Sequence, residues 1–281
     1  MTTQERSFTG AHGETIVYDV TTPDVTGDQG TPRGVVVIVH GMAEHGRRYG
    51  GLVATLVGAG YTVAVPDHLG HGRSGGKRMR VNSFSDYATD LDQVISAVAS
   101  AGSPTFLIGH SMGGTIALDY VLDRPDRVSG LVLSGAGVLP GDDLPGPLIA
   151  MSKIIGKIAP GLPTVALDSA CISRDPQVVA DYETDPLVTR GKIPARLGAE
   201  MVSTMQSFPT RLPALTLPVL VMHGSEDKLT EPEGSRLVDR LAGSTDKTLV
   251  IWDGLRHEIF NEPEKDEVIA TVLTWLDTRT G

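Results

Sequence analysis

The stretch T-F-L-I-G-H-S-M-G-G at residues 105–114 decides the fold. Residues 105–108 have the short apolar pattern of a buried strand, and residues 112–122 have the spacing of a helix. Between them, residues 109–113 fit the pattern G-x-S-x-G, in which a serine sits on a sharp, strained turn from strand to helix. The glycines are needed because only residues without side chains let the two elements pass so closely. The stretch therefore predicts Ser111 as a nucleophile at a helix N-terminus, where backbone N–H groups can meet an oxyanion.

Outward from this turn, apolar strands alternate with helical patterns. Strands are predicted at Val35–Val39, Thr62–Val65, Thr105–Ile108, Leu131–Leu133, Val219–Met222 and Leu249–Trp252. Helices are predicted at Tyr49–Ala59, Phe84–Ala101, Met112–Leu122, Glu233–Leu241 and Glu264–Asp277. This succession predicts an α/β fold with a parallel sheet covered by helices on both faces. An antiparallel hairpin at Ser7–Thr9 and Ile16–Asp19 extends the sheet edge to eight strands.

One region interrupts the alternation. From Val138 to about Phe208 the sequence shows no good strand, many prolines and an apolar helical segment at Leu148–Ile158. A gap of this size between two strands of a parallel sheet favours an inserted subdomain. We therefore expect a first part of the core at 1–137, a helical cap at 138–208 and a second part of the core at 209–281. The apolar helix either packs on the core below or lines a lipid-sized tunnel, and its position favours the cap.

A serine needs a general base, and the base needs an orienting carboxylate. In the α/β-hydrolase fold the chain order is serine, acid, histidine, so both partners follow Ser111. Asp227 and His257 come after two successive predicted strands, at the sheet edge where such sites form. They are the predicted acid and base. Glu226 and Asp253 are rival acids in less favourable positions.

The oxyanion hole is predicted from the segment H-G-M-A-E-H at residues 40–45, which follows the first central strand. In this fold that loop donates one backbone N–H, and the residue after the nucleophile donates the other. Met42 and Met112 are thus the predicted donors. His40 could act in catalysis, but it is interpreted as shaping the loop.

Several kinds of partner are disfavoured. The net charge of −10 opposes nucleic-acid binding, and it does not attract the chain to an anionic membrane. His68 and His71 lie in a glycine-rich turn without further ligands at zinc spacing, so no metal or other cofactor is expected. The single cysteine, Cys171, is interpreted as a small apolar residue rather than a reactive thiol. With neither a secretory signal nor a membrane span recognised, the expected location is the cytoplasm.

The same motifs resemble the monoacylglycerol lipases of the α/β-hydrolase superfamily, and bacterial, mycobacterial-type members most closely. The resemblance covers nearly the whole chain. It is most specific at residues 40–49, 67–74, 109–114 and 257–262, and in the cap at residues 172–187.

The resemblance implies an apolar tunnel for an acyl chain and a polar pocket for glycerol. By motif position, Glu44 and Arg48 would stand near the glycerol and Tyr182 would close over it. Two positions depart from the family pattern. Met42 stands where a smaller residue is usual, and Phe260 stands where some animal members carry a second histidine.

The leading hypothesis is a serine esterase that releases a fatty acid and glycerol from monoacylglycerol. A lysophospholipase or a broad carboxylesterase on the same fold is the alternative, and a non-catalytic binding protein is a more distant one. Ile154 and Ile155 are predicted to line the acyl tunnel. Because the cap is apolar, a peripheral contact with a membrane through it is also considered.

Overall fold

The computed structural model describes residues 1–24, 31–100, 102–140 and 146–280, and in the last of these ranges it describes side chains from Met151 onward. The core is an eight-stranded sheet in the order β1-β2-β4-β3-β5-β6-β9-β10. The strands are β1 Thr2–Thr9, β2 Thr15–Thr22, β3 Val35–Val39, β4 Thr62–Pro66, β5 Thr105–His110, β6 Gly130–Ser134, β9 Val219–Gly224 and β10 Lys247–Trp252. Pairings from β4 to β10 are parallel, whereas β1 and β2 add an antiparallel edge. The predicted eight-stranded, mostly parallel sheet is confirmed.

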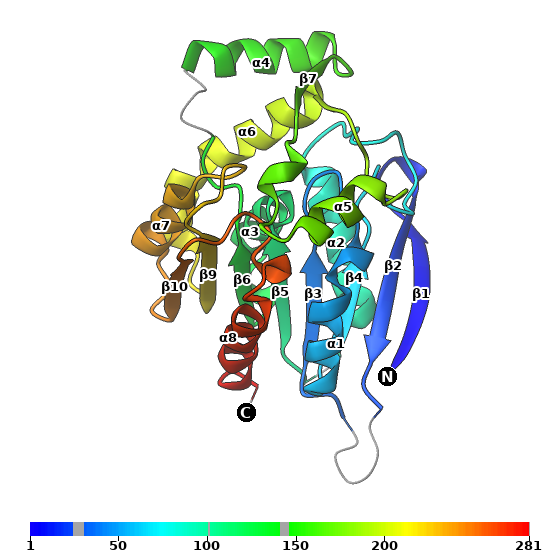
Figure 1. Ribbon diagram of the computed structural model, residues 1–281, viewed down its shortest axis with the longest axis vertical. Helices are drawn as coiled ribbons and strands as arrows, with labels where there is room; N and C mark the ends of the chain where they lie inside the picture. Colours follow the sequence, from blue (N-terminus) through cyan, green and yellow to red (C-terminus); the bar gives the residue numbers. More distant parts are fainter. Residues whose placement is uncertain (25–30, 101, 141–145, 281) are drawn as a thin grey trace.

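Helices cover both faces of this sheet (Figure 1). They are α1 Gly50–Gly58, α2 Ser85–Val98, α3 Met112–Asp123, α7 Pro232–Leu241 and α8 Lys265–Asp277. The alternation of side chains along β3 explains why both faces need covering: Val36 and Ile38 pack toward α1 and α8, while Val37 and Val39 pack toward α2 and α3. All five residues of β3 are buried.

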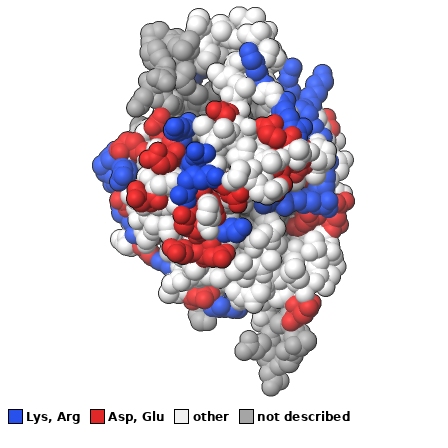
Figure 2. Space-filling view, viewed as in Figure 1, with Lys and Arg blue, Asp and Glu red and all other residues white. Residues whose placement is uncertain are grey.

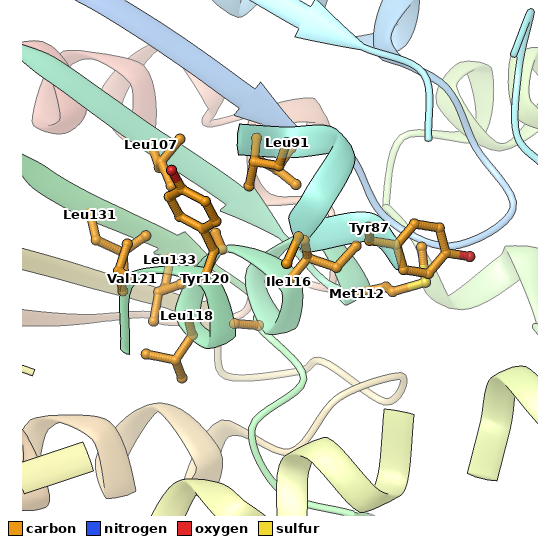
Figure 3. Close-up of a cluster of buried hydrophobic side chains, with 14 of the residues drawn as sticks. Tyr87, Leu91, Leu107, Met112, Ile116, Leu118, Tyr120, Val121, Leu131 and Leu133 are labelled. Carbon is orange, nitrogen blue, oxygen red and sulfur yellow. The ribbon is translucent and has the colours of Figure 1, made fainter. Parts of the chain in front are cut away.

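The core on the α2 and α3 side fixes the helix that follows the predicted nucleophile (Figure 3). Tyr87 and Leu91 of α2 pack with Ile116 and Tyr120 of α3, and Leu107 of β5 lies in the same cluster. These side chains are almost completely buried. Because burying a large apolar side chain stabilises a protein by about 1.5–3 kcal/mol, this cluster holds α3 firmly against the sheet.

Between β6 and β9 the chain builds a layer above the carboxyl ends of the strands (Figure 1). It contains α4 Gly146–Ile158, β7 Pro163–Ala166, α5 Pro176–Thr184, β8 Lys192–Pro194 and α6 Ala195–Arg211. The expectation of no strand here is wrong, since β7 and β8 pair as a small antiparallel sheet. These strands have four and three residues and contain prolines, so their periodicity is too short to recognise. The boundaries at 138 and 208 stay predictions, and the second falls inside α6.

Candidate active site

Ser111 occupies a strained turn between β5 and α3. Its φ of 54° and ψ of −122° lie outside the regions that non-glycine residues favour. The neighbouring glycines make the turn possible because there is no room for side chains. A Cβ on Gly109 would lie 2.7 Å from the carbonyl oxygen of Gly113, and one on Gly113 would lie 2.0 Å from the carbonyl oxygen of Val39.

Asp227 and His257 meet at the carboxyl ends of β9 and β10. The Nδ1–H of His257 donates to Oδ2 of Asp227 over 2.7 Å, and both side chains are buried. Burial acts to lower the pKa of His257, but the charge and hydrogen bond of Asp227 outweigh it and hold this pKa above its usual value. Burial acts to raise the pKa of Asp227, yet contacts with His257 and His223 hold it well below its usual range.

The two rival acids do not reach this histidine. Glu226 is exposed, and Asp253 is exposed with its carboxylate facing the hydroxyl of Ser225. The carboxylate that contacts His257 is that of Asp227.

The loop after β3 lies beside the serine. The N–H of Gly41 donates to Oε1 of Glu44 over 2.6 Å, and Ala43 adopts a left-handed conformation with φ of 67°. Gly41 and Met42 border the same cavity as Ser111. Met112 is the first residue of α3, so its N–H has no partner from within the helix. Of the two predicted donors, Met42 therefore borders the cavity of Ser111, and Met112 follows Ser111 at the start of α3.

A buried ionic network supports this loop. Nη1 of Arg48 donates to Glu44 and to Glu258, each over 2.6 Å, and Nη2 donates to Glu258 over 2.8 Å. Tyr49 donates its hydroxyl proton to Glu44, and the ring of Tyr182 lies 4.8 Å from the Arg48 guanidinium. Burial acts to raise the pKa of Glu258, but Arg48 outweighs it and lowers this pKa. The network therefore ties together the loop after β3, the loop carrying His257 and the cap.

A cavity of about 500 Å³ opens above the serine and is bordered by residues of α4, α5 and α6. One end is polar, with Glu44, Glu258 and His257, and the rest is mostly apolar. The apolar wall includes Leu139, Ile155, Leu167, Met201, Val202 and Met205.

Four of the five predicted substrate-contacting residues lie at this cavity or beside it. Glu44, Tyr182 and Ile155 border it, and Arg48 lies one layer behind, between its two carboxylates. Ile154 does not belong to the wall. It lies on the outer face of α4 with 58% of its surface exposed, because successive helical residues point about 100° apart.

The buried histidines near the loop have structural partners. Nδ1 of His40 donates to the carbonyl oxygen of Gly41, and Nε2 accepts the N–H of His68. Burial keeps the pKa of His40 well below its usual value, so the ring stays neutral and shapes the loop. Within the described parts of the chain, no cluster of histidine, cysteine and carboxylate side chains is placed to hold a metal ion. Cys171 is partly exposed beside Asp168.

Three residues at the site were not assigned from the sequence. Glu258 follows the predicted base directly, Thr230 lies three residues after Asp227, and His223 lies four residues before it. Thr230 and His223 both contact Oδ2 of Asp227, at 2.8 and 3.0 Å. Their closeness to Asp227 in the sequence was the only indication of a role. Turn residues have no regular periodicity, so the sequence does not predict which way their side chains point.

Comparisons with known proteins agree with this architecture. The family described as serine aminopeptidase, S33, matches residues 30–264. A monoacylglycerol lipase of Mycolicibacterium smegmatis is 45% identical over 98% of this chain and 97% of its own. Human monoglyceride lipase is 34% identical over 90% of this chain and 85% of its own. The crystal structure of a monoacylglycerol lipase from Paleococcus ferrophilus superposes with a TM-score of 0.82 at 34% identity, covering 99% of this chain and all of that one.

The fold and the site define a serine hydrolase of the α/β-hydrolase class that acts on carboxylic esters. Within that class, the chain belongs to the monoacylglycerol lipase family.

The ionic network gives a first prediction. Arg48→Met should lower the free energy of unfolding by about 3–5 kcal/mol, because it leaves two buried carboxylates without their cation. Arg47→Met is the matched control. The side chain of Arg47 is 53% exposed against 10% for Arg48, so its loss should cost less than about 1 kcal/mol. Urea unfolding of both variants measures the difference, and equal losses would contradict the role given to the network.

Proposed function

We propose that this enzyme hydrolyses monoacylglycerol to a fatty acid and glycerol, with Ser111 as nucleophile, His257 as general base and Asp227 as the orienting acid. The observation that carries the proposal is the 2.7 Å contact between His257 and Asp227 at the wall of the cavity that Ser111 also borders. The relatives named as monoacylglycerol lipases support the choice of substrate.

In the first step, His257 Nε2 accepts the proton of Ser111 as the hydroxyl oxygen attacks the ester carbonyl. The N–H groups of Met42 and Met112 stabilise the oxyanion, a contribution of about 3 kcal/mol for each such donor. Protonated His257 then gives its proton to the leaving glycerol oxygen, which leaves an acyl-serine. Water, activated by the same histidine, hydrolyses this intermediate and releases the fatty acid.

The cavity suits a substrate with one long apolar part and one polar part. We propose that residues 138–208 act as a cap whose inner face, including Ile155, holds the acyl chain. The glycerol would then lie toward Glu44, Glu258 and Tyr182. Arg48 is engaged by two carboxylates, so its contribution is to hold that polar end in place rather than to bind glycerol directly.

We further propose that the enzyme works in the cytoplasm and draws its substrate from a lipid surface through the cap. Within the described parts of the chain, no helix is long and apolar enough to cross a membrane. The outer side of the cap nevertheless exposes large apolar side chains, among them Ile154, Ile158 and Val165. Soluble proteins rarely leave such a surface uncovered.

The distribution of charged residues also supports contact with a lipid surface. Residues 144–167 contain no Asp or Glu, although the whole chain has 34. Lys157 lies on α4, and Lys192 pairs with Ala166 in the small sheet. In Figure 2 the uppermost part of the molecule shows white and blue atoms, while red atoms lie lower. This end of the molecule therefore lacks the excess of acidic residues that gives the whole chain its negative net charge.

The assignment of the acid gives the second prediction. Asp227→Asn should lower kcat by about 10⁴ on a soluble butyryl ester, because His257 loses the partner that orients and stabilises it. Glu226→Gln is the control and should change kcat little. Both variants should remain folded. A fluorophosphonate is first used to test the nucleophile. It should label the wild-type protein and should not label Ser111→Ala. A severe loss in Glu226→Gln would overturn the assignment.

The acyl site gives the third prediction. Ile155→Ser should reduce kcat/KM for long-chain monoacylglycerols and spare short-chain ones, because each buried methylene contributes up to about 0.8 kcal/mol. Ile154→Ser is the matched control from the outer face of the same helix. Rates are measured below the critical micelle concentration, so that contact with a lipid surface does not enter. An equal loss on all chain lengths would assign Ile155 to stability instead.

The outer face of the cap gives the fourth prediction. Wild-type protein should sediment with phosphatidylcholine vesicles, and Ile158→Asp should weaken this binding several-fold, because it places a charge in the apolar surface. Ala270→Asp is the control, since it adds the same charge to an exposed position on α8, far from α4 (Figure 1). Equal binding by the two variants would rule out the cap as the contact.

A further inference from the structure

His223, at the end of β9, is completely buried and lies beside the predicted catalytic acid. Its Nε2 is 3.0 Å from Oδ2 of Asp227 and 3.3 Å from the carbonyl oxygen of Thr230, and its Nδ1 is 2.7 Å from Oγ of Ser235 on α7. Oδ2 of Asp227 also accepts the Nδ1–H of His257 over 2.7 Å. Two imidazole rings therefore share one carboxylate oxygen.

The tautomer of His223 follows from these contacts. A carboxylate oxygen is only an acceptor, so the nitrogen 3.0 Å from it must carry a proton. Ser235 can donate its hydroxyl proton to Nδ1, and these contacts fit the tautomer of His223 that carries its proton on Nε2.

The other partners of Asp227 leave little freedom to its carboxylate. Oδ1 accepts the N–H groups of Leu229 and Thr230 over 2.8 and 3.1 Å. The Thr230 hydroxyl lies 2.8 Å from Oδ2 and 2.9 Å from the carbonyl oxygen of Gly135, so its one proton is divided between two acceptors. The N–H of His257 is therefore the shortest N–H contact of Oδ2, and the N–H of His223 is divided between Oδ2 at 3.0 Å and the carbonyl oxygen of Thr230 at 3.3 Å.

We propose that His223 is a positioning residue for catalysis: it donates to the oxygen that orients His257, and so limits how strongly Asp227 holds the base. The proposal rests on the proposed function, because it takes His257 as the general base. A donor that draws electron density from Oδ2 weakens the pull of Asp227 on a proton of His257. Without it, His257 would stay protonated to a higher pH and would be unable to accept the serine proton there.

The other charged and titratable groups near His257 do not depend on the contact between His223 and Asp227. The ring of His110 lies 4.6 Å from that of His257, and burial lowers the pKa of His110 to about 4, so it is uncharged near neutral pH. Glu258 and Glu44 act with Asp227 to raise the pKa of His257. The groups that face the Asp227–His257 pair are therefore His110, Glu258, Glu44 and His223.

Two variants separate the contacts of His223. His223→Gln places an amide nitrogen where Nε2 stands, so it keeps a donor to Asp227 and loses the bond to Ser235. His223→Asn keeps a polar group near Ser235, but its shorter side chain falls short of Asp227. In wild-type enzyme, kcat/KM for a soluble butyryl ester should rise with pH through a pKa above the ordinary histidine value, since burial is outweighed by Asp227.

We expect the pH at which kcat/KM reaches half of its maximum on the acid side (the acid limb) to rise by about half a pH unit or more in His223→Asn. In His223→Gln it should rise by less than about 0.2 unit. A limb that moves in neither variant, or equally in both, would overturn the proposal and leave His223 a purely structural role. Loss of stability alone cannot produce the expected pattern, because it lowers activity without moving the limb.

A measurement on the wild-type protein covers the case in which a variant does not fold. Nitrogen-15 NMR of labelled histidines should find His223 neutral with its proton on Nε2, and a proton on Nδ1 would overturn the proposal. This readout needs no activity. If the wild-type enzyme hydrolyses no ester, the proposed function fails, while the NMR result still decides the tautomer on which His223's role depends.

Discussion

Ser111 stands clear of the sheet because α3 crosses β3 and β5 with almost nothing between the backbones. A Cβ on Gly113 would overlap the carbonyl oxygen of Val39, and one on Gly109 would press on Gly113. The strain at Ser111 costs on the order of 1–3 kcal/mol and is held by the packing of α3 on the core. With a wider crossing, the start of α3 would move away from the loop after β3, and the two proposed oxyanion donors would separate.

The second requirement is that three loops from distant parts of the chain keep their relative positions. Arg48 connects Glu44 of the loop after β3 with Glu258, the neighbour of His257. The cap is attached to the same region, because Thr189 donates its N–H to Ala43 and Asp185 pairs with His45. The segment around Asp185 and Thr189 is thus fixed to the loop that follows β3. By contrast, α4 packs chiefly against α6.

The sheet and the turn at Ser111 could be predicted because their signals are local. β3 is a run of five apolar residues, and the turn at Ser111 is specified by the glycines around it. The chain order then pointed to Asp227 and His257. The partners of Asp227 could not be predicted in the same way. The sequence predicts His223 only as a buried residue at the end of a strand. The path of the following loop, which the sequence does not predict, brings Asp227 into contact with it.

Two features between β6 and β9 could not be predicted from the sequence for a different reason. They are the small sheet and the directions in which the side chains of α4 point. β7 and β8 are too short for a period of two to appear. In α4, apolar residues occur on more than one face, so periodicity gives no single inward direction. Ile154 and Ile155 are chemically identical, and the inward position of Ile155 follows from how α4 packs on α6. A helix with apolar residues on more than one face is normally buried on more than one side, whereas α4 is covered by the chain on its inner side and exposes Ile154 and Ile158. The two faces serve different partners if the inner one holds an acyl chain and the outer one meets the lipid surface from which that chain comes.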